Sequence, residues 1–179
     1  MEPDAFISSA AGRRYWSGVD ADVNGMLGGF PGVSGVDVRG SRAFLAKMGV
    51  GSRGGLRRVE RVLEGGAGIG RVTREVLTPI SATVDVIEPI PKFSAQLSSI
   101  PGVGKVFTMG LEEWRPDLGD KYDVIWNQWC VGHLRDDDLV EYLVRCKGAL
   151  IEGGFIVVKE NLSTQGGDVY DEIDSSVTR

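Results

Sequence analysis

The stretch Glu64-Gly65-Gly66-Ala67-Gly68-Ile69-Gly70-Arg71 has the residue types and spacing of a loop that binds a nucleotide-like cofactor. Val62-Leu63 precede it, and Val72 and Leu77 follow at helical spacing, so we expect a buried strand, a glycine turn and a helix. Glycine allows a cofactor to lie against the backbone, because a Cβ atom would fill that space. The unpaired N–H groups at a helix start favour an anionic part of the ligand.

The spacing of the glycines distinguishes between cofactors. Gly66, Gly68 and Gly70 give G-x-G-x-G, whereas the dinucleotide fingerprint requires a third glycine where this chain has Arg71. This spacing with an acidic residue two positions before the first glycine, here Glu64, is typical of S-adenosylmethionine (SAM) methyltransferases. The sequence therefore predicts SAM as the cofactor and S-adenosylhomocysteine (SAH) as its product.

Other residues match the remaining parts of SAM. Glu88 follows Glu64 at close to the ~20-residue interval at which a carboxylate meets ribose hydroxyls. Leu111-Glu112 can border an adenine ring, and Arg71 can form a bidentate pair with the methionine carboxylate. The alternative for Glu88 is a solvated loop acid, and for Arg71 an ordinary surface position on a helix.

The methyl acceptor must present an electron pair in line with the sulfonium methyl, so positioning does most of the work. His133, the only histidine, is a natural proton acceptor near neutral pH, although a structural histidine at a helix entrance is the competing interpretation. Trp129 can hold an apolar or cationic group. The acids of segment 168–174 would favour a basic substrate, unless they are only a solvated loop.

An alternation of strands and helices must position these residues. Strands are expected at 59–63, 82–88, 105–109, 122–126 and 155–159. Helices are expected from Gly70 to before Pro79, at 92–97 and from 136 to 150, the last stopped by Gly153-Gly154. This pattern predicts an α/β fold with a mainly parallel sheet and helices on both faces, and ligands bind at its switch point, outside the carboxyl ends of the strands.

The N-terminal part precedes this pattern. We expect residues 1–14 to be irregular, segment 15–30 to act as a lid or a capping helix, and 36–48 to form a helix with Phe44, Leu45 and Met48 on its core face. The predicted organisation is one domain, with a helical extension at 1–55 and an α/β core at 56–179.

Composition narrows the functional classes. The net charge of -5 and the pI near 5.0 argue against a nucleic-acid partner. Two cysteines predict no disulfide framework, and no stretch reaches the ~20 apolar residues of a membrane span. The N-terminus lacks the features of a signal peptide, so we expect a cytoplasmic or nuclear protein, most simply a monomer, with no metal site.

Several longer motifs resemble the eukaryotic protein N-terminal Xaa-Pro-Lys methyltransferases across roughly residues 15–179. The motifs are Tyr15-Trp16, Gly25-Met26-Leu27-Gly28-Gly29, the glycine loop, Asp123-Val124-Ile125-Trp126, Gln128-Trp129, Gly132-His133-Leu134, Arg145-Cys146-Lys147-Gly148 and Asp174-Ser175-Ser176-Val177. The resemblance implies a Rossmann-like class I SAM-dependent methyltransferase fold. It also implies methylation of the α-amine of proteins that begin, after methionine removal, with X-Pro-Lys or X-Pro-Arg.

The resemblance also implies roles for individual residues. SAM would be held by Gly66, Gly68, Arg71, Glu88, Pro89, Ile90, Leu111, Glu112 and Gln128. The substrate would contact Trp16, Leu27, Trp129, Asn161, Asp171, Asp174 and Ser176. Within that set Trp129 would cover the proline, Asn161 would orient the first residue, and Asp171 and Asp174 would meet the third-position cation. The catalytic residues would be His133 and Asp174 as bases, with Asn161.

The chain departs from the family pattern at a few places. Glu64 and Glu88 replace the more usual Asp, and Glu112 stands where Gln is common. The sequence given stops at Arg179, so the last helix and an antiparallel strand pair are expected to be missing and strand five to be an edge. Two other functions stay open, a SAM-dependent methyltransferase of a small amine and an inactive module that binds basic N-termini.

Overall fold

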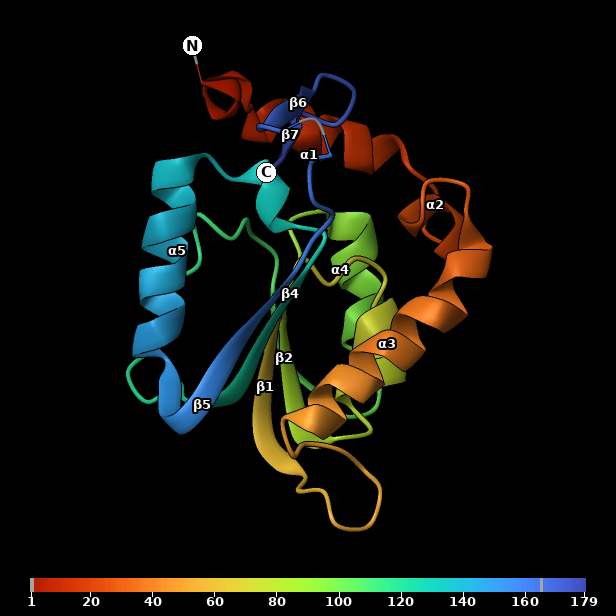
Figure 1. Ribbon diagram of the computed structural model, residues 1–179, viewed down its shortest axis with the longest axis vertical. Coiled ribbons are helices and arrows are strands. Elements are labelled where there is room, and N and C mark those ends of the chain that lie inside the picture. The colour runs from red at the N-terminus through yellow and green to blue at the C-terminus, as the bar shows by residue number, and fades with distance from the viewer. Residues whose placement is uncertain (1, 165) are drawn as a thin grey trace.

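The computed structural model describes residues 2–164 and 166–179, and its centre is a five-stranded sheet (Figure 1). The strands are β1 (Val59–Gly65), β2 (Ser81–Ile87), β3 (Val103–Phe107), β4 (Tyr122–Gln128) and β5 (Leu150–Lys159). Their order is β3-β2-β1-β4-β5, and every pair within this sheet is parallel. The predicted switch point is therefore confirmed, because β1 lies between β2 and β4, at the reversal of strand order.

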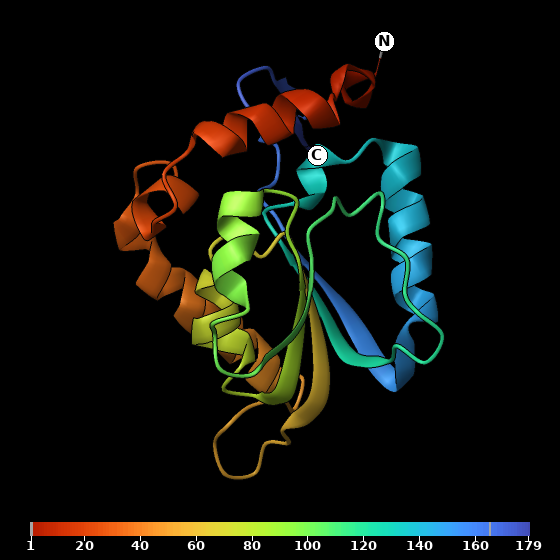
Figure 2. The same ribbon diagram turned by 180° about the vertical axis from the view of Figure 1, so that it is seen from behind.

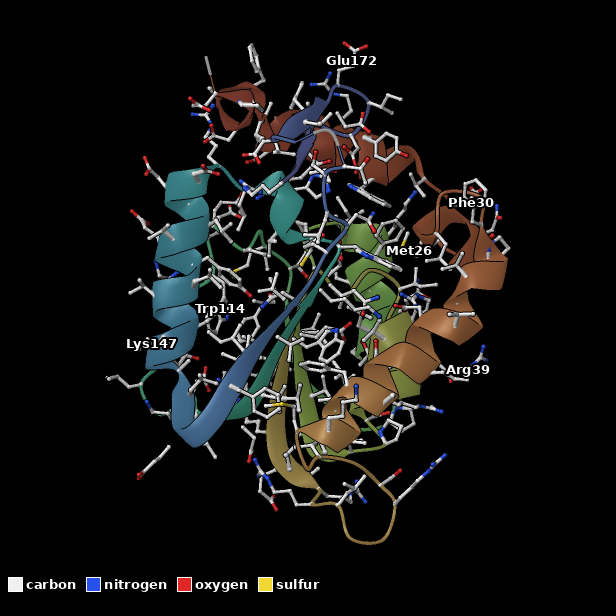
Figure 3. All side chains as sticks on the ribbon, in the orientation of Figure 1. Met26, Phe30, Arg39, Trp114, Lys147 and Glu172 are labelled. Atoms are coloured by element: carbon white, nitrogen blue, oxygen red, sulfur yellow. The ribbon has the colours of Figure 1, made fainter. Side chains whose placement is uncertain are left out.

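Helices cover both faces of the sheet (Figures 1 and 2). One face packs against α3 (Ser34–Lys47), the π-helical turn η3 (Thr73–Leu77) and α4 (Pro91–Leu97), around the alternate strand residues Val62, Val84 and Val124. The other face packs against α5 (Asp136–Gly148) through Leu63, Ile87 and Ile125. Figure 3 shows Trp114 between α5 and the sheet, where it is fully buried. The strands are apolar on both sides because both faces are covered.

The described part of the N-terminal segment is mostly helical, so the expectation of an irregular segment at 1–14 was wrong for residues 2–14; Met1 lies outside the described residues. It contains η1 (Pro3–Phe6), α1 (Ser9–Gly18), α2 (Val23–Met26) and η2 (Pro31–Val33). The hydroxyl of Ser8 accepts a hydrogen bond from the amide of Ala11, and this N-cap satisfies one of the free donors of α1. In Figure 1 helix α1 lies across the carboxyl ends of the strands, above the switch point.

The acidic segment predicted as a loop is a β-hairpin. Strands β6 (Val169–Asp171) and β7 (Ser176–Thr178) form a separate antiparallel sheet beside α1 rather than an extension of β5. The amide of Ser8 donates to the hydroxyl of Ser175 at 2.8 Å, and Phe6 packs on Tyr170 with ring centroids 5.7 Å apart. The hairpin and the N-terminal helix thus lie side by side over the sheet.

The end of α5 and the buried face of α3 differ from the sequence prediction. Helix α5 ends at Gly148 and β5 begins at Leu150, so the pair Gly153-Gly154 lies inside the strand. Gly153 has φ +75°, and the pairing of β4 with β5 shifts register there, which identifies a bulge rather than a helix stop. Phe44 on α3 and Met48 just after it are exposed, so the predicted core face was wrong for both and right for Leu45. The buried residues of α3 are Asp37, Val38, Ser41 and Leu45.

The described residues contain neither a membrane-spanning helix nor a cluster of metal ligands. No helix at 2–164 or 166–179 is long and apolar enough to cross a membrane. No group of three or more His, Cys, Asp and Glu side chains in the same ranges could hold a metal ion. The division predicted between residues 55 and 56 falls in the turn that joins α3 to β1 and stays a prediction.

Candidate active site

The glycine loop forms the floor of a cavity at the carboxyl end of β1. Gly66 and Gly68 have φ +65° and +55°, a conformation that side chains rarely adopt. A Cβ atom on Gly66 would lie 2.4 Å from Cβ of Cys130, and one on Gly68 would lie 2.8 Å from Sδ of Met26. In Figure 3 Met26 points from α2 toward this loop. The positive φ disfavours a side chain at both glycines, and at Gly66 Cβ of Cys130 also leaves no room for one.

Two buried carboxyl groups lie at the ends of β1 and β2. Glu64 accepts a hydrogen bond from the hydroxyl of Thr73 at 2.5 Å, and burial raises the pKa of Glu64 to about 8. Glu88 accepts from the amides of Gly68 at 2.7 Å and Ile90 at 2.8 Å. Burial raises the pKa of Glu88 to about 7, against the lowering effect of those two amides. Glu88 therefore fixes the shape of the glycine loop and changes charge near neutral pH.

All nine residues predicted to hold the cofactor line this one cavity. They are Gly66, Gly68, Arg71, Glu88, Pro89, Ile90, Leu111, Glu112 and Gln128. They come from the ends of β1, β2 and β4 and from the segment after β3, which the parallel sheet brings to one edge. Ile69, Ile90 and Phe93 give its wall an apolar character, and Ser8, Gly12 and Arg13 of the N-terminal segment complete it.

Behind the cavity lies a charged cluster around the buried residues Asp37 and Arg71 that the sequence analysis did not identify. Asp37 of α3 accepts hydrogen bonds from Arg71 at 2.7 Å and from Gln128 at 2.9 Å. Lys159 of β5 also donates to the Asp37 carboxylate, and its Nζ lies 2.9 Å from the hydroxyl of Ser41. The signal in the sequence is the spacing of Asp37, Ser41 and Leu45, which places an acid on the core face of a helix.

A second cavity adjoins the first on the side of the hairpin. Trp16, Met26, Trp129 and His133 line both cavities. Of the remaining residues predicted to bind or process the substrate, the second cavity is lined by Leu27, Asn161, Asp174 and Ser176. Asp171 is not among its lining residues; it is exposed on β6, and its carboxylate accepts from the amide of Ile173 at 2.8 Å.

His133 and Asp174 lie at the junction of the two cavities. Nε2 of His133 is 4.0 Å from Oδ2 of Asp174 and accepts a hydrogen bond from the indole N–H of Trp16 at 3.1 Å. The hydroxyl of Ser176 donates to Oδ1 of Asp174 at 2.6 Å. Because Ser176 occupies Oδ1, Oδ2 of Asp174 is the oxygen that faces the junction. Nε2 of His133 accepts the bond from Trp16, so the ring proton of neutral His133 is on Nδ1.

The loop that carries Trp129 is held in an unusual conformation. Trp129 has φ +54°, and its amide donates to the carbonyl of Lys159 at 3.0 Å. One carboxylate oxygen of Glu160 accepts from the amides of Cys130 at 2.8 Å and Val131 at 2.9 Å. Such a conformation persists only where the surroundings enforce it, and it aims the indole of Trp129 into the space between the cavities.

Helix α1 is fastened over the cofactor cavity by an ion-pair cluster. Arg13 pairs with Glu112 at 2.9 Å and with Glu113 at 2.7 Å, and both acids lie in the segment after β3. Near the C-terminal end of α1, Nζ of Lys92 donates to the carbonyl of Ser17 at 2.6 Å. These contacts join α1 to the rim of the sheet, as expected for a segment that closes over a ligand.

These residues fit SAM. The glycine cradle is too tight for a Cβ atom, an apolar wall can take an adenine ring, and buried Glu88 can accept hydrogen bonds from a ribose diol. Arg71 lines the same cavity and supplies a cation for a carboxylate. The pair at the junction, His133 and Asp174, supplies proton acceptors next to that cavity.

Nearly the whole chain matches one protein family. A family model described as AdoMet dependent proline di-methyltransferase matches residues 4–179. The chain belongs to this family. The resemblance drawn from its motifs is thereby confirmed, as are SAM (AdoMet) as the cofactor and the class I methyltransferase fold.

Individual relatives agree with this family membership. The chain is 43% identical over 187 residues to Alpha N-terminal protein methyltransferase 1 of Schizosaccharomyces pombe, covering 100% of this chain and 81% of that protein. It is 40% identical over 182 residues to human N-terminal Xaa-Pro-Lys N-methyltransferase 1, covering 97% of this chain and 78% of that one. A SAM-dependent methyltransferase of Leishmania major superposes with a TM-score of 0.83 at 37% identity, covering 95% of this chain and 67% of that structure.

Proposed function

We propose that this family member transfers methyl groups from SAM to the α-amine of proteins that begin with X-Pro-Lys or X-Pro-Arg. One observation supports it most directly: the cofactor cavity opens toward a second cavity at Trp129 and His133, with Asp174 4.0 Å from the imidazole. The human relative is named N-terminal Xaa-Pro-Lys N-methyltransferase 1, and this name supports the same substrate class.

The residues of the cofactor cavity bind and orient SAM. SAM, when bound, supplies a methyl group on a positively charged sulfur. The carboxylate of Glu88 would accept hydrogen bonds from the ribose hydroxyls, and Arg71 would pair with the methionine carboxylate. Leu111 and Ile90 would border the adenine, and Arg13 of α1 closes the cavity by pairing with Glu112. Water is thereby excluded from the reacting atoms.

The acceptor end holds the N-terminus of the substrate. The indole of Trp129 packs on the proline of the second position, and Asn161 orients the first residue from the end of β5. Trp16 and Leu27 close the cavity from the N-terminal segment. A planar aromatic face and the ring of proline are complementary in shape, and this contact selects proline over a flexible side chain.

Proton handling belongs to Asp174 and His133. A free α-amine has a pKa of ≈ 7.7–8.0, so the site needs to hold its neutral form rather than to abstract the proton forcefully. Oδ2 of Asp174 faces the junction and takes the proton first. Nε2 of His133 is occupied by the indole N–H of Trp16, so His133 accepts a proton only after the substrate displaces that bond.

The charge of the hairpin selects the third residue. Asp174 lines the second cavity, and its negative charge attracts the lysine or arginine at that position. Asp171 is exposed on β6 and contributes a weaker, longer-range attraction. The acidic net charge of the chain adds to the attraction of a basic N-terminus.

Fragment-ion mass spectrometry of a peptide beginning Ser-Pro-Lys tests this function. Incubation with SAM is expected to add methyl groups to the α-amine only, and the same peptide with an acetylated N-terminus is expected to remain unmodified. A small primary amine is the control for the alternative methyltransferase. Methylation of the lysine side chain, or faster turnover of the small amine, would contradict the proposal. Binding of SAM and peptide without transfer would identify a recognition module instead.

A further inference from the structure

We propose that Asp37 is a positioning residue of the cofactor site, whose carboxylate holds Arg71 and Gln128 in place and leaves the cluster with one unbalanced positive charge. The inference rests on the proposed role of Arg71 in binding the methionine carboxylate. Asp37 lies on α3 and is not among the residues that line either cavity, so it acts through its neighbours.

The carboxylate of Asp37 is buried and accepts hydrogen bonds from three side chains. Only 3% of its side chain is exposed, and Arg71, Gln128 and Lys159 all donate hydrogen bonds to it. Burial alone would raise the pKa of Asp37, but the bonds from Lys159, Arg71 and Gln128 outweigh burial and hold the pKa below its usual value. Asp37 is therefore a carboxylate at neutral pH.

Asp37 orients Gln128 and Arg71. The amide of Gln128 donates to Asp37 with its nitrogen and accepts from the indole N–H of Trp126 with its oxygen at 3.2 Å, which fixes its orientation. Arg71 is 9% exposed and uses Nη1 for Asp37, so its other donors are available to the cavity that it lines. A buried guanidinium without this partner would be strongly destabilised where it stands.

The cluster of Asp37, Arg71 and Lys159 has a net positive charge. Arg71 and Lys159 carry two positive charges and Asp37 carries one negative charge, and the pKa of about 8 leaves nearby Glu64 mostly protonated at neutral pH. Both cations also lie near the ring of Trp129, at 5.5 Å and 5.9 Å from its centroid. The remaining single positive charge matches one carboxylate, which the amino-acid end of SAM or SAH provides and a bare nucleoside does not.

Two probes separate this role from a general effect on the fold. SAH carries the amino-acid end, whereas 5′-methylthioadenosine is the same nucleoside thioether without it. Asp37→Asn is expected to weaken SAH roughly tenfold or more, because Arg71 and Lys159 then repel one another and Arg71 leaves its position. The affinity for 5′-methylthioadenosine is expected to stay within about threefold, because Glu88 and the glycine loop are unchanged.

The matched control is Arg42→Gln on the same helix. Arg42 donates to the carbonyl of Glu75 at 2.8 Å and makes an exposed contact between α3 and η3, away from the cluster. Both affinities are expected to be unchanged in this variant. Should Asp37→Asn fail to fold, Lys159→Met provides a second test: it neutralises the cluster and is expected to weaken SAH, but not 5′-methylthioadenosine, by about threefold or more.

Calorimetric titration of both probes without any peptide decides the matter. Equal weakening of the two probes would show that Asp37 only supports the fold, and tighter SAH would show that Asp37 competes for Arg71. Unchanged SAH affinity would show that Asp37 has no role in cofactor binding. If the unmutated protein itself fails to prefer SAH over 5′-methylthioadenosine, the role proposed for Arg71 fails instead. Peptide methylation, measured separately, tests the proposed substrate.

Discussion

The two halves of the active site are built in different ways. The cofactor half consists of backbone and buried side chains at the ends of β1, β2 and β4, such as the glycine loop and Glu88. The substrate half is assembled from the N-terminal helix, the β4 loop and the hairpin, and its key side chains are about a quarter exposed, with His133 at 27% and Asp174 at 23%.

This difference indicates how each half responds to change. The cofactor half shares the rigidity of the central sheet, so it tolerates no side chain at its glycines. The substrate half depends on bonds between distant parts of the chain, such as Trp16 to His133 and Ser8 to Ser175. Such contacts open more easily than a sheet and allow a peptide to enter.

The largest effect is expected for Gly68→Val, which places a side chain in the glycine loop of the cofactor half. Its φ of +55° is strained for valine, by roughly 1–2 kcal/mol, and the new side chain would meet Met26. We expect calorimetry to detect no binding of SAH, with only a modest drop in melting temperature. Gly119→Val is the control, since Gly119 also has a positive φ but no neighbour within 4 Å. Normal SAH affinity in Gly68→Val would disprove the location of the cofactor cavity.

The next effect concerns the charge of the substrate half. Peptides with lysine at position three are expected to bind the SAH complex roughly tenfold or more tightly than peptides with glutamate, the scale of a charged hydrogen bond. Asp174→Lys is expected to cancel or invert this preference, and Asp171→Lys to reduce it slightly, because Asp174 lines the cavity and Asp171 is not among its lining residues. Equal affinities for the two peptides in the unmutated protein would refute a charge-selective hairpin.

The pH dependence of SAH affinity is expected to come from Glu88. Burial raises its pKa to about 7, and the ionised form is the better acceptor for ribose hydroxyls, so binding lowers this pKa. Below the pH at which Glu64 ionises (pKa about 8), affinity is therefore expected to rise with pH and to level off near pH 7, with a slope of at most tenfold per unit. Glu88→Gln should bind more weakly with a flat profile. A flat profile in the unmutated protein would contradict this role for Glu88.

The smallest effect is expected at the lid. The ion pairs of Arg13 with Glu112 and Glu113 are partly exposed, so Arg13→Gln is expected to cost about 1 kcal/mol or less of SAH affinity. The difference between the variant and the unmutated protein should shrink at about 1 M salt, where such pairs are screened. A loss that persists at high salt would indicate that Arg13 acts by packing rather than by charge.

The cofactor half was largely predictable from the sequence, because its signals are local. A glycine loop after an apolar run, and an acid at the end of the next strand, imply their own positions once the strands are parallel. All nine predicted cofactor residues lie in one cavity for that reason. The error at Gly153-Gly154 has a local cause too, since a glycine pair suits a bulge as well as a helix stop.

The contacts of the substrate half and the Asp37 cluster were not predictable in the same way. The bond from Trp16 to His133 joins residues that are distant in the sequence, and no local pattern specifies it. Lys159 and Asp37 pair across the fold, from β5 to α3. Such pairs follow from tertiary packing, which a single sequence does not reveal.

The single-turnover rate of His133→Ala, together with its SAH affinity, tests the separation of the two halves most directly. With a saturating Ser-Pro-Lys peptide, methylation is expected to slow mainly below neutral pH and to recover toward about pH 9, where the α-amine is neutral without help. SAH affinity should barely change. Trp16→Phe removes the indole N–H that Nε2 of His133 accepts while keeping an aromatic ring, so it separates the loss of this hydrogen bond from the loss of the imidazole. A uniform loss of rate at every pH, or a parallel loss of SAH affinity, would make His133 structural and contradict the account.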